Sequence, residues 1–434
     1  MRKHFRYFKE LLTLSLPILA GNLGNVLIGT GSVIVAGKHS TVTLASISVA
    51  TAILMTIMVC AIGLISSVSP VLSNIRGARK PTKTLFKATL AYAMVLAAVF
   101  FVLIRLATLC VPYIGLAPEL NEPVVQFLNI GSFSIFGVCL YFSLKEFLQA
   151  YEIVVFANAL SIIGIFVNFG LCFLLVFGFL AIPPMGIEGI AWSNLIVRVL
   201  EGIALLIYCI PFLKGKNRKY HLYLKELLKT GYPISLAVFA EFFGFNITAV
   251  LVGKFSSVYT AAHNVILTIT AASYMIPFSI SNAMAIKVGY ANGERNLQDV
   301  KRYALAGTLL IFGVMFLTMF VYLFFTRQLM GIFTDDQAVI AVGVPLAVIV
   351  ICFLFFDGLQ CACAGALKGL KETRPIMYTM VGAFIFIGLP IGCVLAFRYN
   401  IVLQGFWIGL AVALFFASVV SSIFLLRKIR KLDY

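Results

Sequence analysis

Residues 9–18 read KELLTLSLPI and residues 225–234 read KELLKTGYPI, so position 225 repeats position 9 after 216 residues. The same spacing, without a gap, relates Gly37-Lys38 to Gly253-Lys254. Three further pairs keep it: Gly77 with Gly293, Arg79 with Arg295, and Gly189 with Gly405. A fixed spacing of glycines, a proline and boundary charges predicts that the chain contains two copies of one structural unit.

The composition is that of a membrane protein. Hydrophobic residues make up 62% of the chain, charged residues make up 11%, and the mean hydropathy is +1.05. Apolar runs along the chain are long enough to cross a hydrocarbon layer of roughly 30 Å as helices. We expect twelve spans, at about 11–36, 44–72, 84–109, 126–150, 155–178, 186–212, 226–252, 258–288, 302–325, 338–366, 375–397 and 404–427.

These spans predict an all-α membrane protein with two pseudo-symmetric six-helix lobes. The one substantial hydrophilic interior segment lies between the sixth and seventh spans. We therefore expect an N-terminal lobe at 1–213, a connector at 214–224 and a C-terminal lobe at 225–434. Because each lobe has an even number of spans, the two lobes share one orientation in the membrane, as in many secondary transporters.

The net charge of +17 reflects membrane topology. If the spans alternate, all but six of the 33 Lys and Arg residues lie on the side that holds both termini. The six are Lys38, Arg105, Arg198, Lys254, Arg327 and Arg398. By the positive-inside rule we expect a multi-pass protein of the cell (inner) membrane with both termini in the cytoplasm. Nucleic acid is not an expected partner.

Two acidic residues stand out because ionisable groups inside spans are costly and usually functional. Glu241 lies in the seventh span and Asp357 in the tenth, and neither has a Lys or Arg three or four positions away. Such carboxylates can load and release H⁺ or Na⁺. The alternative is a purely structural, hydrogen-bonded carboxyl. If both helices are straight, their rise per residue places the two acids at different depths in the membrane. A bend at Asp357-Gly358 would bring them to the same depth.

The first lobe is different. Asn25 occupies the position equivalent to Glu241, and the ionisable pair is Arg198 with Glu201, three positions apart on one helix face. The pair either neutralises itself or forms a polar patch facing a central cavity. No catalytic constellation, phosphate-binding glycine loop or metal spacing occurs in the sequence. We expect a transporter rather than an enzyme, with no cofactor.

In order and spacing, nine motifs resemble the multidrug and toxic compound extrusion (MATE) family, in its bacterial NorM-type branch. They are Leu16-Pro17-Ile18-Leu19, Val35-Ala36-Gly37, Gly77-Ala78-Arg79, Ala261-Ala262-His263-Asn264, Met275-Ile276-Pro277, Lys287-Val288-Gly289-Tyr290, Phe333-Thr334-Asp335-Asp336, Gly365-Ala366-Leu367-Lys368-Gly369 and Trp407-Ile408-Gly409. The resemblance covers nearly the whole chain. It implies a MATE/MOP-type fold with a V-shaped cavity, and efflux of organic cations and drugs driven by Na⁺ or H⁺.

The resemblance also implies roles for individual residues. The acids of the family's seventh and tenth helices fall on Glu241 and Asp357, which would couple transport to the ion and form a possible Na⁺ site. The first-helix acid falls on Ser32, and a tyrosine one turn before the tenth-helix acid is replaced by Phe353. These departures favour coupling through the second lobe. The candidate residues of the substrate cavity are Asn25, Ser32, Arg198, Glu201, Asn264, Asn282 and Phe353.

One alternative within the same superfamily stays open, a flippase for a lipid-linked saccharide. Its large anionic substrate would need several cationic residues in the cavity, and only Arg198 and Arg105 are candidates. Two unpaired acids favour a cationic cargo. We further expect that the chain works as a monomer in the lipid bilayer. The choice between Na⁺ and H⁺ is open.

Overall fold

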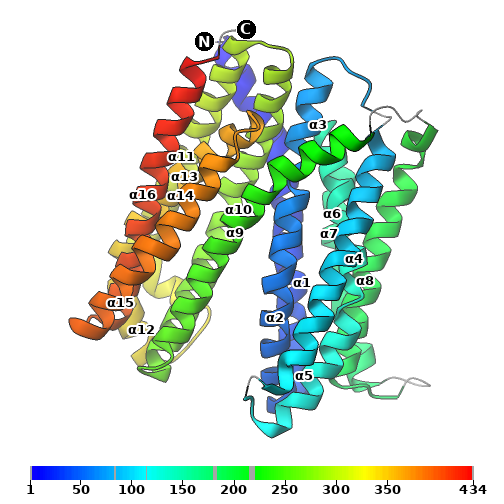
Figure 1. Cartoon of the computed structure of the whole chain (residues 1–434). Helices are drawn as coiled ribbons and strands as arrows, with labels where there is room; N and C mark the ends of the chain where they lie inside the picture. Colours follow the sequence, from blue (N-terminus) through cyan, green and yellow to red (C-terminus); the bar gives the residue numbers. More distant parts are fainter. Residues whose placement is uncertain (1, 83–84, 114, 179–182, 215–219, 433–434) are drawn as a thin grey trace. The chain divides into compact units, whose positions relative to one another are not determined.

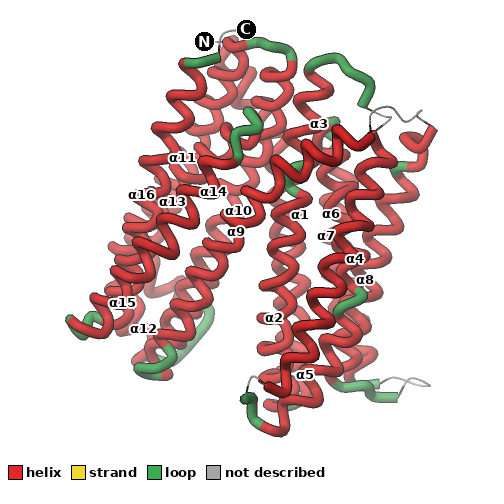
Figure 2. The backbone as a smooth tube through the Cα atoms, in the orientation of Figure 1, coloured by secondary structure: helices red, strands yellow, loops and turns green. Residues whose placement is uncertain are grey.

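A computed structural model describes residues 2–82, 85–113, 115–178, 183–214 and 220–432 of the chain. Among these residues all regular structure is helical, with no strand (Figure 2). In the described ranges, eleven helices are long and apolar enough to span a membrane. The pair α5 (Pro118–Gly131) and α6 (Ser134–Ala150), bent by 44°, makes a twelfth when counted as one broken span. The predicted all-α membrane fold is therefore confirmed.

The chain divides into two compact units (Figure 1). The N-terminal unit comprises residues 20–76 and 80–235, and the C-terminal unit comprises residues 1–19, 77–79 and 236–434. Two long helices, α1 (Arg2–His39) and α9 (Tyr220–Val252), contribute residues to both units, and Gly77 at the end of α3 (Val68–Gly77) belongs to the C-terminal unit. The predicted connector at 214–224 includes residues 215–219, which lie outside the described residues, so the predicted lobe boundaries stay a prediction.

The remaining elements follow in chain order. In the N-terminal unit they are α2 (Thr41–Ile65), α3 (Val68–Gly77), α4 (Phe86–Cys110), a 3₁₀ turn (Val111–Tyr113), α5, α6, α7 (Val155–Phe177), α8 (Ile187–Tyr208) and a 3₁₀ turn (Ile210–Lys214). In the C-terminal unit they are α10 (Ser257–Gly293), α11 (Leu297–Gly331), α12 (Gln337–Gly343), a 3₁₀ turn (Val344–Leu346), α13 (Ala347–Gly369), α14 (Arg374–Val381), a π-helical segment (Gly382–Gly388), α15 (Leu389–Arg398) and α16 (Val402–Arg430).

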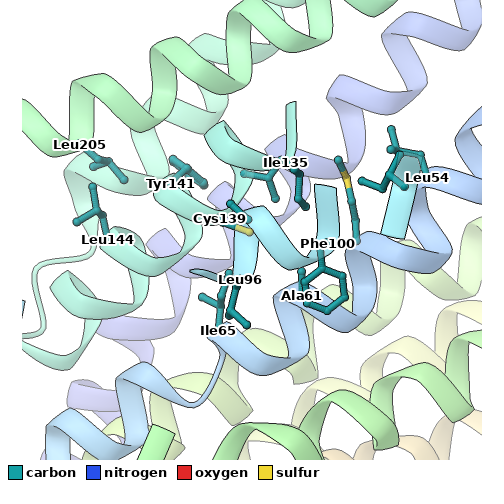
Figure 3. Packing of buried hydrophobic residues seen from close by; sticks show 14 of the residues in the cluster. Leu54, Ala61, Ile65, Leu96, Phe100, Ile135, Cys139, Tyr141, Leu144 and Leu205 are labelled. Carbon is teal, nitrogen blue, oxygen red and sulfur yellow. The ribbon is translucent and has the colours of Figure 1, made fainter. Parts of the chain in front are cut away.

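The core of the N-terminal unit forms around α6. This helix packs against α4 and α8, and α5 packs against α2 and α8. Side chains from four of these helices meet in the core, among them Leu54, Leu96, Ile135 and Leu205 (Figure 3). Because lipid is as apolar as these side chains, close packing rather than burial from water holds such helices together.

In the C-terminal unit α13 has the corresponding central position, in contact with α10, α11 and α16. Glycines bring neighbouring helices close to each other. A Cβ atom on Gly365 of α13 would lie 2.6 Å from the carbonyl oxygen of Ser281 on α10. A Cβ atom on Gly409 of α16 would lie 2.5 Å from the carbonyl oxygen of Gly388. Such small residues at helix contacts are typical of membrane bundles.

We expect Gly409→Val to destabilise the protein by about 1–3 kcal/mol, because the added side chain must push α16 away from the backbone at Gly388. Thermal denaturation of the purified protein in detergent measures this effect. The control is Gly313→Val on α11, where an added Cβ atom meets nothing within 4 Å. Equal stability of the two variants would show that the contact at Gly409 is looser than described.

The sequence repeat also has a counterpart in the backbone. Arg79 is the second residue after α3, and Arg295 is the second residue after α10. Both adopt the left-handed conformation, with φ of 54° and 59°. Glu152 and Lys371 do the same two residues after α6 and α13, with φ of 65° and 59°. The two halves therefore end corresponding helices in the same way, as expected for a duplicated unit.

Candidate functional site

The two predicted coupling acids both belong to the C-terminal unit. Asp357 on α13 is only 2% exposed, and Glu241 on α9 is partly buried. Their carboxylates are close enough for the two charges to interact electrostatically. Since α13 contacts α10, α11 and α16, Asp357 is enclosed by helices rather than directed into lipid.

Polar and charged side chains of two helices complete the surroundings of these acids. Tyr274 on α10 lies near both Glu241 and Asp357. Lys368, eleven residues after Asp357 on α13, interacts electrostatically with Glu241. Eleven residues are close to three helical turns, so Asp357 and Lys368 lie on the same face of α13.

Within the described part of the chain, neither acid forms an ion pair. Two carboxylates that share a poorly solvated site repel each other when both are ionised. A proton or a cation taken up between them removes this repulsion, while Lys368 partly offsets the charge of Glu241. The arrangement is therefore suited to reversible uptake of one positive charge.

The bend suggested at Asp357-Gly358 does not interrupt the helix, because α13 is continuous from Ala347 to Gly369. The irregular part of the tenth span lies earlier, at the 3₁₀ turn Val344–Leu346 between α12 and α13. The two acids thus interact although α13 has no break at Asp357.

The described residues contain no group of three or more His, Cys, Asp or Glu side chains that could hold a metal ion. A Na⁺ ion at the two acids would need additional oxygen ligands, such as hydroxyl or backbone carbonyl groups or water. The possible Na⁺ site at Glu241 and Asp357 stays a prediction.

The N-terminal unit contains a hydrogen-bonded ionic cluster. Arg198 on α8 donates to Asn25 Oδ1 at 2.6 Å and to Glu201 Oε2 at 3.3 Å. Asn25 Nδ2 donates in turn to Ser161 Oγ at 3.2 Å, and Ser161 is hydrogen-bonded to the Tyr141 hydroxyl. The predicted pairing of Arg198 with Glu201 is thus present and includes Asn25 of α1.

A second cation at this cluster was not expected. Lys145 on α6 is 2% exposed, donates to Asn22 Oδ1 at 3.2 Å, and interacts electrostatically with Glu201. Glu201 is 4% exposed, and its Oε1 atom has no hydrogen-bond partner among the described residues. In the sequence, Lys145 counts as a boundary charge because it lies five residues before the end of a span. Its position inside an apolar helix is the feature of the sequence that could have indicated a buried cation.

Ser32, at the position of the family's first-helix acid, lies in a neutral amide cluster. Its hydroxyl is within hydrogen-bonding distance of Asn168 Oδ1 at 3.4 Å and Asn194 Oδ1 at 3.3 Å. Asn168 Nδ2 also donates to Asn194 Oδ1 at 3.0 Å. Neither asparagine was singled out in the sequence. The cluster brings α1, α7 and α8 together without a charged group.

The three remaining cavity candidates belong to the C-terminal unit. Phe353 is buried one turn before Asp357 and packs edge-on against Trp407 and Phe245. Asn264 on α10 is exposed, and Asn282 on the same helix is partly buried. The candidates thus come from both units, and their assignment to one substrate cavity stays a prediction.

Comparison with known proteins agrees with the sequence repeat and with the helical fold. A family model, MatE, matches this chain twice, at residues 17–174 and 233–394. The two matches begin 216 positions apart, which is the spacing of the sequence repeat. The chain is similar to solved structures of a eukaryotic MATE transporter, AtDTX14 (TM-score 0.88, 18% identity, covering 99% of this chain and 98% of that one), and of a MOP superfamily transporter from Pyrococcus furiosus (TM-score 0.87, 17% identity, covering 99% and 97%). The predicted MATE/MOP-type fold is confirmed.

Bacterial sequences are similar over nearly their full length. "Probable multidrug resistance protein NorM" of Xylella fastidiosa (strain 9a5c) is 29% identical over 425 residues, covering 95% of this chain and 90% of that one. "Multidrug resistance protein NorM" of Photobacterium profundum is 25% identical over 433 residues, covering 96% and 95%. The resemblance seen in the sequence motifs is confirmed: the chain belongs to the MatE family, and it is a multi-pass membrane transporter of the NorM type rather than an enzyme.

Proposed function

We propose that this chain exports organic cations and drugs across the cell membrane in exchange for Na⁺ or H⁺. The observation that carries this proposal is the pair of acids in the C-terminal unit, Glu241 and Asp357, which interact with each other and form no ion pair within the described residues. The names of the bacterial relatives, which are multidrug resistance proteins, support the same direction.

In the proposed mechanism, Na⁺ or H⁺ enters from outside and binds at Glu241 and Asp357. Ion uptake removes the repulsion between the carboxylates and changes the relative stability of the outward-open and inward-open conformations. A difference of a few kcal/mol is sufficient for a large population shift. The cationic substrate leaves when the ion occupies the site, and the ion is released inside. No cofactor takes part.

The proposed location is the inner membrane with both termini in the cytoplasm. The charge asymmetry of the sequence supports this orientation. Helix α1 begins and α16 ends at the same end of the C-terminal unit, as an even number of spans requires (Figure 1). We propose a monomer as the working form.

The flippase alternative is less well supported. A large anionic substrate needs several available cationic side chains in the cavity. Of the two candidates, Arg198 is already bonded to Glu201 and Asn25, and Arg105 is a single exposed residue near the end of α4. Lys145, the second buried cation of that cluster, also interacts electrostatically with Glu201. The two acids of the C-terminal unit would instead repel an anionic headgroup.

Dye efflux in everted membrane vesicles tests the proposed function. A Na⁺ gradient and a pH gradient are imposed separately on vesicles that contain the protein and on vesicles that lack it. We expect one of the two gradients to drive transport of a cationic dye above the level of the empty vesicles. If neither gradient drives transport by protein present at normal levels, the antiport mechanism is wrong.

A further inference from the structure

An open groove lies between α4, α5 and α8 of the N-terminal unit. Its volume is about 650 Å³. Phe101 on α4, Ile130 on α5 and Leu195 on α8 give it apolar walls, and Phe133 at the break between α5 and α6 is 50% exposed. The charged side chain of Arg105 and the indole of Trp192 also line the groove.

Arg105 carries a charge on an apolar helix face. Its neighbours on α4, Leu103, Leu106 and Leu109, are large exposed hydrophobic residues, as expected of a face that contacts lipid. Arg105 lies five residues before the end of α4, which corresponds to about 8 Å along the helix. An arginine at this depth is costly unless its side chain reaches the interface and finds a partner.

Among the described residues, the hydrogen-bond partner of Arg105 is neutral. Arg105 Nη1 donates to Asn129 Oδ1 at 2.5 Å. Among the described residues no carboxylate forms an ion pair with Arg105. Glu122 on the adjacent α5 instead accepts a hydrogen bond from Gln126. The amide of Asn129 orients the guanidinium but leaves its positive charge unbalanced.

The position of Trp192 indicates the depth of the groove in the membrane. It lies five residues after the start of α8. If the spans alternate, α4 ends on the side of the membrane where α8 begins. Arg105 and Trp192 are therefore about equally far from that surface. Tryptophan at this depth is typical of the interface between headgroups and acyl chains.

From these observations we propose that the groove is a binding site for a phospholipid of the leaflet opposite to the chain termini. The lipid phosphate binds the Arg105 guanidinium, which offers several N–H donors to phosphate oxygens. One acyl chain lies along Phe101, Ile130 and Leu195, and Trp192 packs at the level of the glycerol. The site lies wholly within the N-terminal unit and does not depend on the proposed ion coupling.

Photo-crosslinking of the full-length purified protein tests the site. The probe is phosphatidylglycerol with a diazirine group on one acyl chain, and labelled peptides are identified by mass spectrometry. We expect labelling of the groove to fall about fivefold in Arg105→Gln, since one arginine near the membrane surface is worth about 1 kcal/mol toward anionic lipid. Arg105→Lys retains most of the labelling.

The matched control is Arg327→Gln on α11, which removes an arginine hydrogen-bonded to Gln337 and should not change labelling of the groove. A diazirine diacylglycerol, which has no phosphate, labels the groove of the unmodified protein weakly if phosphate is recognised. Equal labelling by both probes, or unchanged labelling of a folded Arg105→Gln variant, would overturn the proposal. So would the absence of labelled groove peptides in the unmodified protein.

Discussion

Asp357→Asn is expected to reduce ion-driven dye efflux by about tenfold or more, because a neutral amide can no longer exchange a positive charge. A tenfold loss corresponds to about 1.4 kcal/mol, which is less than the shift that a coupled ion must supply. The measurement is efflux in everted vesicles, normalised to the amount of protein in the membrane. Glu241→Gln should have an effect in the same direction.

The matched control is Asp335→Asn, the same chemical change at an exposed acid between α11 and α12. It should leave efflux unchanged. Because Glu241 and Asp357 are proposed to bind the same ion, efflux by the double variant should be little lower than efflux by the more impaired single variant. Full efflux by both single variants at normal expression would refute ion coupling at these acids.

The second large effect concerns the ionic cluster of the N-terminal unit. We expect Arg198→Gln to destabilise the protein by about 3 kcal/mol, because it removes the hydrogen-bonded partner of a buried carboxylate. The side chains of Arg198 and Glu201 are 13% and 4% exposed. Denaturation of the purified protein in detergent, followed at increasing temperature or denaturant concentration, measures the loss.

Arg198→Gln combined with Glu201→Gln should recover much of this stability, since neither member of the pair is then left charged without the other. The control is Arg327→Gln, which removes an exposed arginine. A single variant as stable as the unmodified protein would show that Arg198 is not needed to balance Glu201. A double variant that is stable but inactive in efflux would assign the pair a role in transport as well as in packing.

Several features of this protein follow from the sequence because they depend only on order along the chain. The repeat at Lys9 and Lys225 predicted the duplication that the left-handed residues Arg79 and Arg295 show in the backbone. Span lengths predicted the helices, since backbone groups in lipid must be paired within a segment. Glu241 and Asp357 were identified from the cost of a charge inside such a segment.

Other features depend on which face of a helix packs against which neighbour. The hydrophobic periodicity of the sequence does not identify these faces when nearly every position is apolar. Lys145 lies close enough to a span end to be taken for a boundary charge, yet it faces the interior and donates to Asn22. The amide cluster of Ser32 unites helices far apart in sequence. The 3₁₀ turn Val344–Leu346 depends on local backbone geometry that composition alone did not indicate.

Release of the coupling ion by substrate is the most direct test of exchange at the two acids. Purified protein in weakly buffered detergent solution is mixed with a transported cation, while a pH indicator and a Na⁺-selective electrode record what is set free. Ion exchange at Glu241 and Asp357 predicts release of H⁺ or Na⁺ from the unmodified protein and none from the Glu241→Gln/Asp357→Asn variant. Equal release from both proteins would contradict it.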